Sequence, residues 1–307
     1  MKVSVIIPAY NAENFLAGTI DSALTQETDF PFEVVVLDDG SSDGTRDVMD
    51  SYGGRIRSIK QSNQGVSAAR NNAIRAARGE YIALLDSDDY WKPGKLQAQV
   101  DLFESRPDEN IGIVDTFTEI INHKGKVIEV LDRVKRGQAF KQLLAGNAIN
   151  QPSSIMFPKR VFEDVGGFDS EVDGVEDYDF CLRVSHSYAI YTLEKIYCAW
   201  VHHEENTTRN FERQHAQSLK LRRKIRRMYP DDVDEAMYRR MVARSEAYFI
   251  PWFFRGGRYG RVLSMTARML RNNPASIRHK SMLFAGLALL GPVGKRIHKA
   301  VGRDTRG

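Results

Sequence analysis

Strand-like and helix-like segments alternate through the N-terminal part of the chain, and this order constrains the fold more than any other feature. The β-branched segment 3–7 precedes a helix-like pattern over 12–26, with Leu16, Ile20 and Leu24 on one face. The alternation then repeats three times: 33–37 with 45–51, 56–60 with 66–78, and 81–85 with a helix opened by Pro93. This order predicts an α/β fold, with a mostly parallel sheet covered by helices on both faces.

Polar segments follow three of the predicted strands. They comprise residues 8–11, residues 38–44 and residues 86–89, and the last holds three aspartates. Ligands of such sheets bind beyond the carboxyl ends of the strands, so we expect these segments to meet at one edge. Ionised carboxylates repel one another unless a cation lies between them, and oxygen ligands suit Mg²⁺ or Mn²⁺. The sequence therefore predicts a metal site that serves a nucleoside diphosphate.

The rest of the chain predicts two domains. A hairpin is expected over 111–131 and a short strand over 153–157, and a polar loop precedes a helix that ends near residue 187. Beyond residue 205 the pattern is helical and rich in arginine. We expect a catalytic domain over residues 1–205 and a basic, aromatic-containing helical region over residues 206–307.

The charge of the chain is uneven. Residues 1–200 carry a formal charge of −10, and residues 201–307 carry +14. A basic tail beside an acidic body predicts contact with a membrane surface, a phosphorylated lipid or nucleic acid, or else a solvated face that pairs with the acidic body. The N-terminus lacks a signal-peptide pattern, and Cys181 and Cys198 are the only cysteines. These features predict a reducing, cytoplasmic location.

Several stretches, taken in order, resemble family 2 glycosyltransferases with the GT-A fold, in the bacterial group that builds surface polysaccharides. The resemblance covers roughly residues 3–208. The matching stretches are VSVIIPAYN at 3–11, VLDDGSSDGT at 36–45, NQGVSAARN at 63–71, LDSDD at 85–89, GGFD at 166–169 and EDYDF at 176–180. The resemblance implies transfer of a sugar from a nucleotide-sugar donor, most simply a UDP-sugar, to a glycan or a lipid-pyrophosphate-linked acceptor.

The resemblance also implies roles for the nucleotide-binding positions. The backbone around Pro8 and Ala9, together with Asp39, would hold the nucleotide base, and Asp86 would bind the ribose hydroxyls. A carboxylate that accepts from a base N–H suits uridine or thymidine. Arg70 would bind the diphosphate or the base, and the alternative is that it pairs with an acid at the sheet edge.

Metal and catalytic roles follow from the same resemblance. Asp88 would ligate a Mn²⁺ or Mg²⁺ ion on the diphosphate, and His203 would complete the metal or diphosphate site, with His202 as the alternative. Asp177 would be the general base that takes the proton of the acceptor hydroxyl. A single displacement of this kind inverts the anomeric centre. Asp89 is expected instead to cap the helix near Pro93.

The basic tail leaves two interpretations open. Its aromatic residues alternate with arginines, as at the interfacial zone of a membrane, which predicts peripheral contact with the inner face of the plasma membrane. The alternative is a helical cap whose aromatics pack on the catalytic domain. The aromatics concerned are Phe249, Trp252, Phe253, Phe254 and Tyr259.

Two other function classes compete with glycosyl transfer. A nucleotidyltransferase needs a glycine-rich, arginine-bearing loop after the first strand, where this chain has residues 8–12 without either residue type. A non-catalytic protein would bind a nucleotide sugar or an anionic surface through the tail. No nucleic-acid-binding motif accompanies the arginine-rich stretch, so we expect no nucleic-acid partner.

Overall fold

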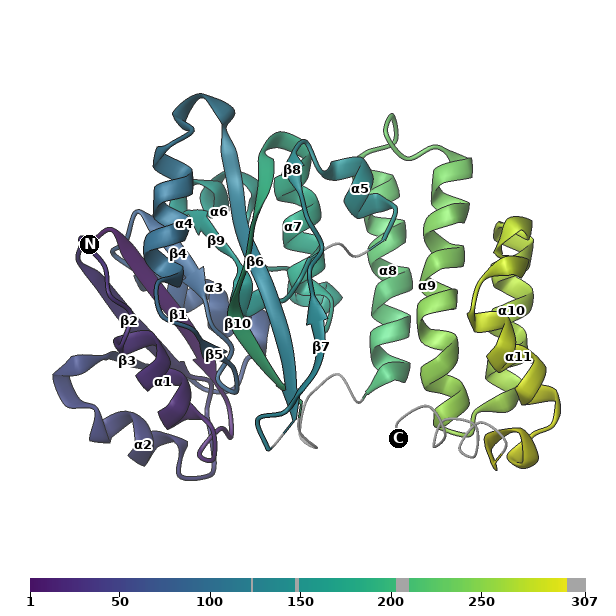
Figure 1. The fold of residues 1–307 in the computed structure, drawn as a ribbon, viewed down its shortest axis with the longest axis horizontal. Helices are drawn as coiled ribbons and strands as arrows, with labels where there is room; N and C mark the ends of the chain where they lie inside the picture. Colours follow the sequence, from purple (N-terminus) through teal and green to yellow (C-terminus); the bar gives the residue numbers. More distant parts are fainter. Residues whose placement is uncertain (123, 147–148, 203–209, 297–307) are drawn as a thin grey trace. The chain divides into compact units, whose positions relative to one another are not determined.

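The structure is a computed structural model that describes residues 1–122, 124–146, 149–202 and 210–296. Contacts between residues divide the chain into two units (Figure 1). The first comprises Met1–Leu143 and Asn147–Asn206, and the second comprises Leu144–Gly146 and Thr207–Gly307. The first unit holds the β-sheet, and helices α8–α11 belong to the second. The assignment of catalysis to residues 1–205 stays a prediction.

Four parallel strands form the first half of the sheet. They lie in the order β3-β2-β1-β4, and their bounds are Val3–Ala9 for β1, Phe32–Asp38 for β2, Arg57–Lys60 for β3 and Tyr81–Leu84 for β4. The helices of this half are α1 (Leu16–Leu24), α2 (Thr45–Ser51), α3 (Val66–Ala76) and α4 (Lys95–Glu104). The predicted α/β class is confirmed, and the alternation of strands and helices follows the sequence pattern.

The second half of the sheet mixes directions. Strand β9 (Met156–Pro158) is antiparallel to β4 and to β6 (Ile111–Asn122), while β10 (Ala189–His202) is parallel to β6. Three short strands add antiparallel pairs: β5 (Tyr90–Trp91) and β8 (Arg136–Gly137) on β10, and β7 (Val127–Leu131) on β6. The sheet is therefore parallel only in part, and the predicted mostly parallel arrangement holds for its first half. The hairpin after β6 accounts for β7, and β9 runs opposite to both of its neighbours. Helices α5 (Phe140–Leu144), α6 (Lys159–Val165) and α7 (Glu176–Ser187) complete the unit.

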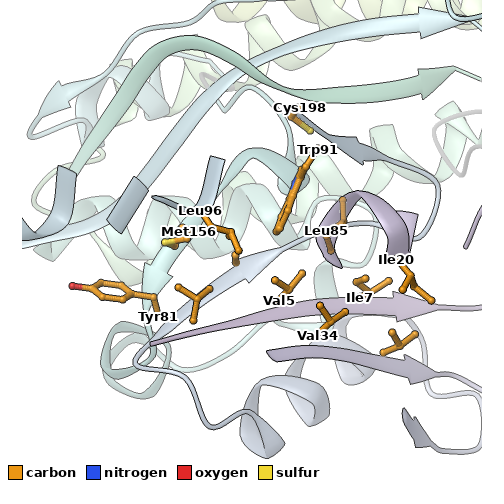
Figure 2. Close-up of a cluster of buried hydrophobic side chains, with 14 of the residues drawn as sticks. Val5, Ile7, Ile20, Val34, Tyr81, Leu85, Trp91, Leu96, Met156 and Cys198 are labelled. Atoms are coloured by element: carbon orange, nitrogen blue, oxygen red, sulfur yellow. The ribbon is translucent and has the colours of Figure 1, made fainter. Parts of the chain in front are cut away.

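Apolar side chains of the strands form cores on both faces of the sheet. Val5 and Ile7 of β1 point into a cluster with Ile20 and Leu96 from α1 and α4 (Figure 2). Successive side chains of a strand point to opposite faces. The buried Ile6 therefore lies on the other face of β1, the strand against which α3 packs. Both faces are covered, as the sequence predicts.

The second unit is helical and has its own core. Its helices are α8 (Phe211–Met228), α9 (Glu235–Arg255), α10 (Tyr259–Asn272) and α11 (Ser281–Leu289), with a 3₁₀ turn η6 (Pro274–Arg278) before α11. Asn210 and Asp234 cap α8 and α9, since their side chains accept from Arg213 N at 3.1 Å and Met237 N at 2.6 Å. Within the part of the chain that is described, no helix is long and apolar enough to cross a bilayer.

The phenylalanines of α9 do not face solvent. Phe249, Phe253 and Phe254 are exposed by 5%, 3% and 0%, and Trp252 and Tyr259 pack against the same helical core. The prediction that these five rings form a membrane-facing surface is therefore wrong. Their spacing places the phenylalanines on the inner face of α9, where burying a large ring stabilises the fold by about 1.5–3 kcal/mol.

Candidate active site

The loops after β1 and β2 are joined where these strands end. Asp39 N donates to Ala9 O at 2.8 Å, which continues the strand pairing one residue past β2. Beyond it, Asn11 N donates to Ser41 Oγ at 3.0 Å, and Ser42 N donates to Asn11 Oδ1 at 2.9 Å. The predicted base-binding residues Pro8, Ala9 and Asp39 thus lie together at the carboxyl edge of the sheet.

Asp39 is buried and organises the loop that leads into α3. Its carboxylate accepts from Gln61 Nε2 at 2.7 Å, from Gln64 N at 2.9 Å and from Gly65 N at 2.9 Å. An ionised carboxylate offers about four acceptor positions, so one is left for a base N–H. The structure therefore gives Asp39 a positioning role, and base recognition by Asp39 stays a prediction.

Arg70 of α3 lies between acids from two distant segments. It is 3% exposed, and it donates to Asp86 Oδ1 at 2.6 Å and to Glu176 Oε1 at 2.7 Å. Burial opposes the charge of Arg70, but the nearby carboxylates outweigh it and raise the pKa of the guanidinium. Of the two alternatives that the sequence left open, the structure shows the pairing of Arg70 with an acid at the sheet edge.

Asp177, the predicted base, lies in the first turn of α7 beside this ion pair. It is half-buried, and its Oδ1 accepts from Tyr178 N at 2.7 Å. Burial and the adjacent charge of Glu176 raise the pKa of Asp177 to about 7, although Arg70 works in the opposite direction. A carboxylate with such a pKa is a stronger base than an ordinary aspartate, and it is about half ionised at neutral pH and largely ionised at mildly alkaline pH.

Two residues that the sequence analysis did not single out hold α7 and α3 together. Arg183 of α7 pairs with Asp179 at 2.8 Å and donates to Gly167 O at 2.7 Å. The side chain of Asn71, in α3, exchanges two hydrogen bonds of 2.8 Å with the backbone of Phe168. Asn71 lies in the matched stretch at 63–71, and Gly167 lies in the stretch at 166–169. Membership in these stretches was the sequence signal that could have pointed to these contacts. These contacts fix Asp177 relative to Arg70.

Asp86 and Asp89, at the end of β4, have different surroundings. The side chain of Asp86 is 23% exposed and faces Arg70. Asp89 is fully buried and accepts from Ser153 Oγ and from Val201 N, the latter at 3.3 Å. The prediction that Asp89 caps the next helix is wrong, because α4 begins at Lys95 without a side-chain cap and Asp89 bonds to other segments instead. Burial, and then the charges of its neighbours, raise the pKa of Asp89 well above its usual value.

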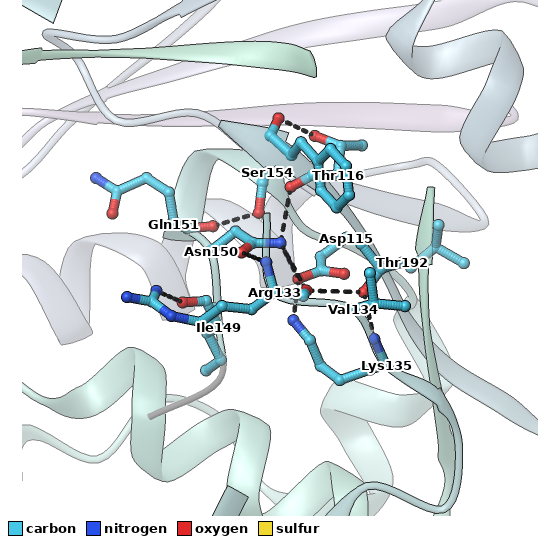
Figure 3. A network of polar contacts seen from close by, with 12 residues as sticks. Asp115, Thr116, Arg133, Val134, Lys135, Ile149, Asn150, Gln151, Ser154 and Thr192 are labelled. Atoms are coloured by element: carbon cyan, nitrogen blue, oxygen red, sulfur yellow. Dashed lines mark hydrogen bonds and ion pairs between the residues drawn. The ribbon is translucent and has the colours of Figure 1, made fainter. Parts of the chain in front are cut away.

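Ser153 links this acidic run to the second half of the sheet. Its Oγ accepts a hydrogen bond from Asp86 N at 3.0 Å, and its O–H donates to the carboxylate of Asp89. A buried polar network secures the segment around it (Figure 3). In this network Asp115 pairs with Lys135 at 2.6 Å, and Asn150 Nδ2 donates to Asp115 Oδ2 at 3.1 Å. The network therefore fixes the segment that leads into Ser153, whose hydroxyl bonds to the backbone of Asp86.

The structure describes one of the two histidines considered for the metal site. His203 lies outside the described residues, and His202 is exposed at the end of β10. Across the described ranges, no group of three or more acidic, histidine or cysteine side chains converges as a metal site. Mg²⁺, however, is commonly held by one or two carboxylates together with substrate phosphates and water. The partly exposed Asp88, next to the buried Asp89, fits such an ion as its single carboxylate ligand from this run.

The family assignment rests on comparison with known sequences. The sequence model described as glycosyl transferase family 2 matches residues 4–166, just over half of the chain. The chain belongs to this family. Among family 2 relatives, chondroitin synthase of Escherichia coli is 33% identical over 209 residues, which are 67% of this chain and 30% of that protein. An uncharacterized glycosyltransferase of Rickettsia felis is 33% identical over 59% of this chain and 31% of its own length. The chain thus spans about a third of the length of these relatives.

Solved structures agree on the fold. TarS residues 1–349 of S. aureus superpose with a TM-score of 0.60 at 19% identity, over 94% of this chain and 90% of that one. The same TarS fragment has been solved in complex with UDP-GlcNAc, and this structure also superposes with a TM-score of 0.60. The GT-A-type fold with a C-terminal helical region, predicted for a family 2 glycosyltransferase, is therefore confirmed.

Proposed function

We propose that this chain transfers a sugar from a nucleoside diphosphate sugar to an acceptor hydroxyl, with Asp177 as the general base. The single observation that carries the proposal is the position of Asp177. It is a half-buried carboxylate with a pKa of about 7, beside Arg70 and within the electrostatic influence of Asp86 at the sheet edge. This arrangement suits a group that must accept a proton near neutral pH.

A UDP-sugar is the proposed donor. Support comes from the fold shared with TarS, which was solved with UDP-GlcNAc and with UDP. In this chain the loops after β1 and β2 would hold the base through Pro8, Ala9 and Asp39. Asp86 would bind the ribose, and its hydrogen bond from Arg70 would hold the carboxylate in place.

The proposed reaction is a single displacement. The acceptor oxygen forms a bond to the anomeric carbon as the bond from that carbon to the diphosphate oxygen breaks. The acceptor proton passes to Asp177, and the nucleoside diphosphate leaves with the bonding electron pair, which inverts the anomeric centre. A divalent ion held by Asp88, with His203 as its proposed second ligand, would supply positive charge at the diphosphate.

The proposed acceptor is a glycan or a lipid-pyrophosphate-linked sugar in surface polysaccharide synthesis. The relatives named as polysaccharide synthases support this class, as chondroitin synthase of Escherichia coli does. We further propose a cytoplasmic location with peripheral contact at the inner face of the plasma membrane. Because the phenylalanine rings of α9 are buried, we place this contact on another surface of the helical unit.

A thermal-shift panel of nucleotide sugars, with and without Mn²⁺, tests donor and metal together. We expect one donor to raise the Tm only with metal, and Asp88→Ala to abolish this shift. Asp177→Asn should keep the shift but lose turnover, whereas Asp108→Asn, an exposed and remote acid, should keep both. Full turnover by Asp177→Asn would reassign the base. Retention of the anomeric configuration, seen by NMR of the product, would refute the single displacement.

A further inference from the structure

Helix α11 leaves large apolar side chains in solvent on one side. Its inner side packs in the core of the helical unit, where the ring of Phe284 lies 5.5 Å from that of Phe254 and Ala288 is buried. On its outer side, Leu283 is 64% exposed and Leu289 is 73% exposed. Neighbouring apolar residues extend this surface, which we call the α11 face and which comprises Ile277, Leu283, Leu289, Leu290 and Val293, all more than half exposed.

The segment of the chain that contains α11 carries charge of one sign. Residues 247–303 contain 11 lysines and arginines and no aspartate or glutamate. Arg278 and Lys280 lie just before α11, Lys295 and Arg296 lie just after it, and all four are exposed. An apolar surface with cations on both sides has the composition of proteins that bind at the interface of anionic membranes.

We propose that the α11 face docks on the surface of an anionic lipid bilayer. The apolar side chains would leave water for the boundary between headgroups and acyl chains, and the flanking cations would lie among the lipid phosphates. A second copy of this chain is a poorer occupant, because an acid-free basic segment would meet an identical segment with no carboxylate to offset it. The exposed apolar surface and the charge thus favour the same partner.

This inference deepens the proposed membrane contact by naming the segment that makes it. It does not depend on the assignment of Asp177, because α11 belongs to the helical unit and the general base to the other unit. Membrane binding and sugar transfer can therefore be measured separately on the full chain.

Sedimentation with phospholipid vesicles tests the proposal. The full chain is mixed with vesicles of phosphatidylcholine alone or of phosphatidylcholine with phosphatidylglycerol. We expect binding to the anionic vesicles only. The double variant Leu283→Ser/Leu289→Ser should bind about a hundredfold more weakly or worse, the scale expected for losing two inserted leucines. The matched control is Val127→Ser/Ile128→Ser, which removes two side chains exposed by 45% and 56% on β7 of the other unit, and it should bind normally.

A second variant separates charge from apolar contact. Arg278→Gln/Lys280→Gln should also weaken binding, and added salt should reduce binding of the wild type more than binding of this variant. Equal binding of the leucine variant and the wild type would overturn the role of the α11 face. Failure of the wild type to bind any vesicle would overturn the membrane contact itself and leave the transferase proposal standing. Conversion of a wild-type dimer to a monomer by the leucine substitutions would assign the face to self-association instead.

Discussion

The raised pKa of Asp177 makes a quantitative prediction about the pH dependence of transfer. A base must be ionised to accept a proton, so kcat/KM follows the ionised fraction of Asp177. With a pKa of about 7, about half of the protein has the base ionised at pH 7, and about a tenth at pH 6. We therefore expect kcat/KM to fall about tenfold per pH unit below pH 7. An aspartate at its ordinary pKa of 3.8 would keep the rate flat down to about pH 5.

Substitution of Arg70 tests the cause of this fall in kcat/KM below pH 7, the acid limb of the profile. Its positive charge lowers the pKa of Asp177, so Arg70→Gln should raise that pKa and move the acid limb to higher pH. A shift of about one unit corresponds to about 1.4 kcal/mol, a plausible scale for losing one nearby charge at a partly exposed site. The activity lost at pH 7 should then recover in part at higher pH, which a merely misfolded site would not do.

The assay is the initial rate of nucleoside diphosphate release, measured from about pH 5 to pH 9. Arg75→Gln is the matched control, because Arg75 is an exposed arginine on the same helix that donates to Asn72 at 2.9 Å. It should leave the profile of the wild type unchanged. A wild-type rate that stays flat below pH 7 would refute the raised pKa of Asp177 or its role as the base. An equal shift in Arg70→Gln and Arg75→Gln would show that the effect is not local.

Three further predictions concern stability. The folded-state pKa of Asp177 is raised above its unfolded value of 3.8, so this group lowers the stability of the wild type as the pH rises from about 4 to 7. In thermal melts, Asp177→Asn should therefore be more stable than the wild type at pH 8 by about 1–2 kcal/mol, allowing for partial exposure. Its gain over the wild type at pH 5 should be smaller. Ser153→Ala should cost about 1–3 kcal/mol in urea unfolding, because it removes the hydroxyl that donates to the buried Asp89, and an unchanged midpoint would contradict this. Gly167→Ala should cost about 1–3 kcal/mol by the same measurement, because a Cβ at Gly167 would lie 2.4 Å from Asn71 Oδ1, and a neutral result would mean that Asn71 can move away.

Local patterns in the sequence predicted much of the first half of the fold. The bounds of α2, Thr45–Ser51, agree with the predicted helix, and the hairpin of β6 and β7 was also predicted. These elements depend on the periodicity of nearby apolar residues, which the chain displays directly. The short strand predicted over 153–157 starts later than predicted, at Met156, because residues 152–154 form a 3₁₀ turn.

The phenylalanines of α9 were predicted to face a membrane, although their spacing in the sequence indicates burial. Phe249, Phe253 and Phe254 recur at the spacing of one helical face, which by itself indicates burial in a helical core. The arginines near them in the sequence predicted a membrane-facing surface instead. The leucines that do face solvent lie in α11, where an apolar run without polar alternation does not show which side is covered.

The sequence alone determined the family, the α/β class and the position of the acids at the ends of strands, because these features are carried by short contiguous stretches. Only the tertiary structure decided what surrounds each acid. Asp89 became a buried acceptor for Ser153 and Val201, and Arg70 joined Asp86 to Glu176, 106 residues further along the chain than Arg70 itself. The pKa of a carboxyl depends on every charge and every apolar group around it, whatever their separation along the chain. The raised pKa of Asp177 is therefore a property of the folded protein that no local motif contains.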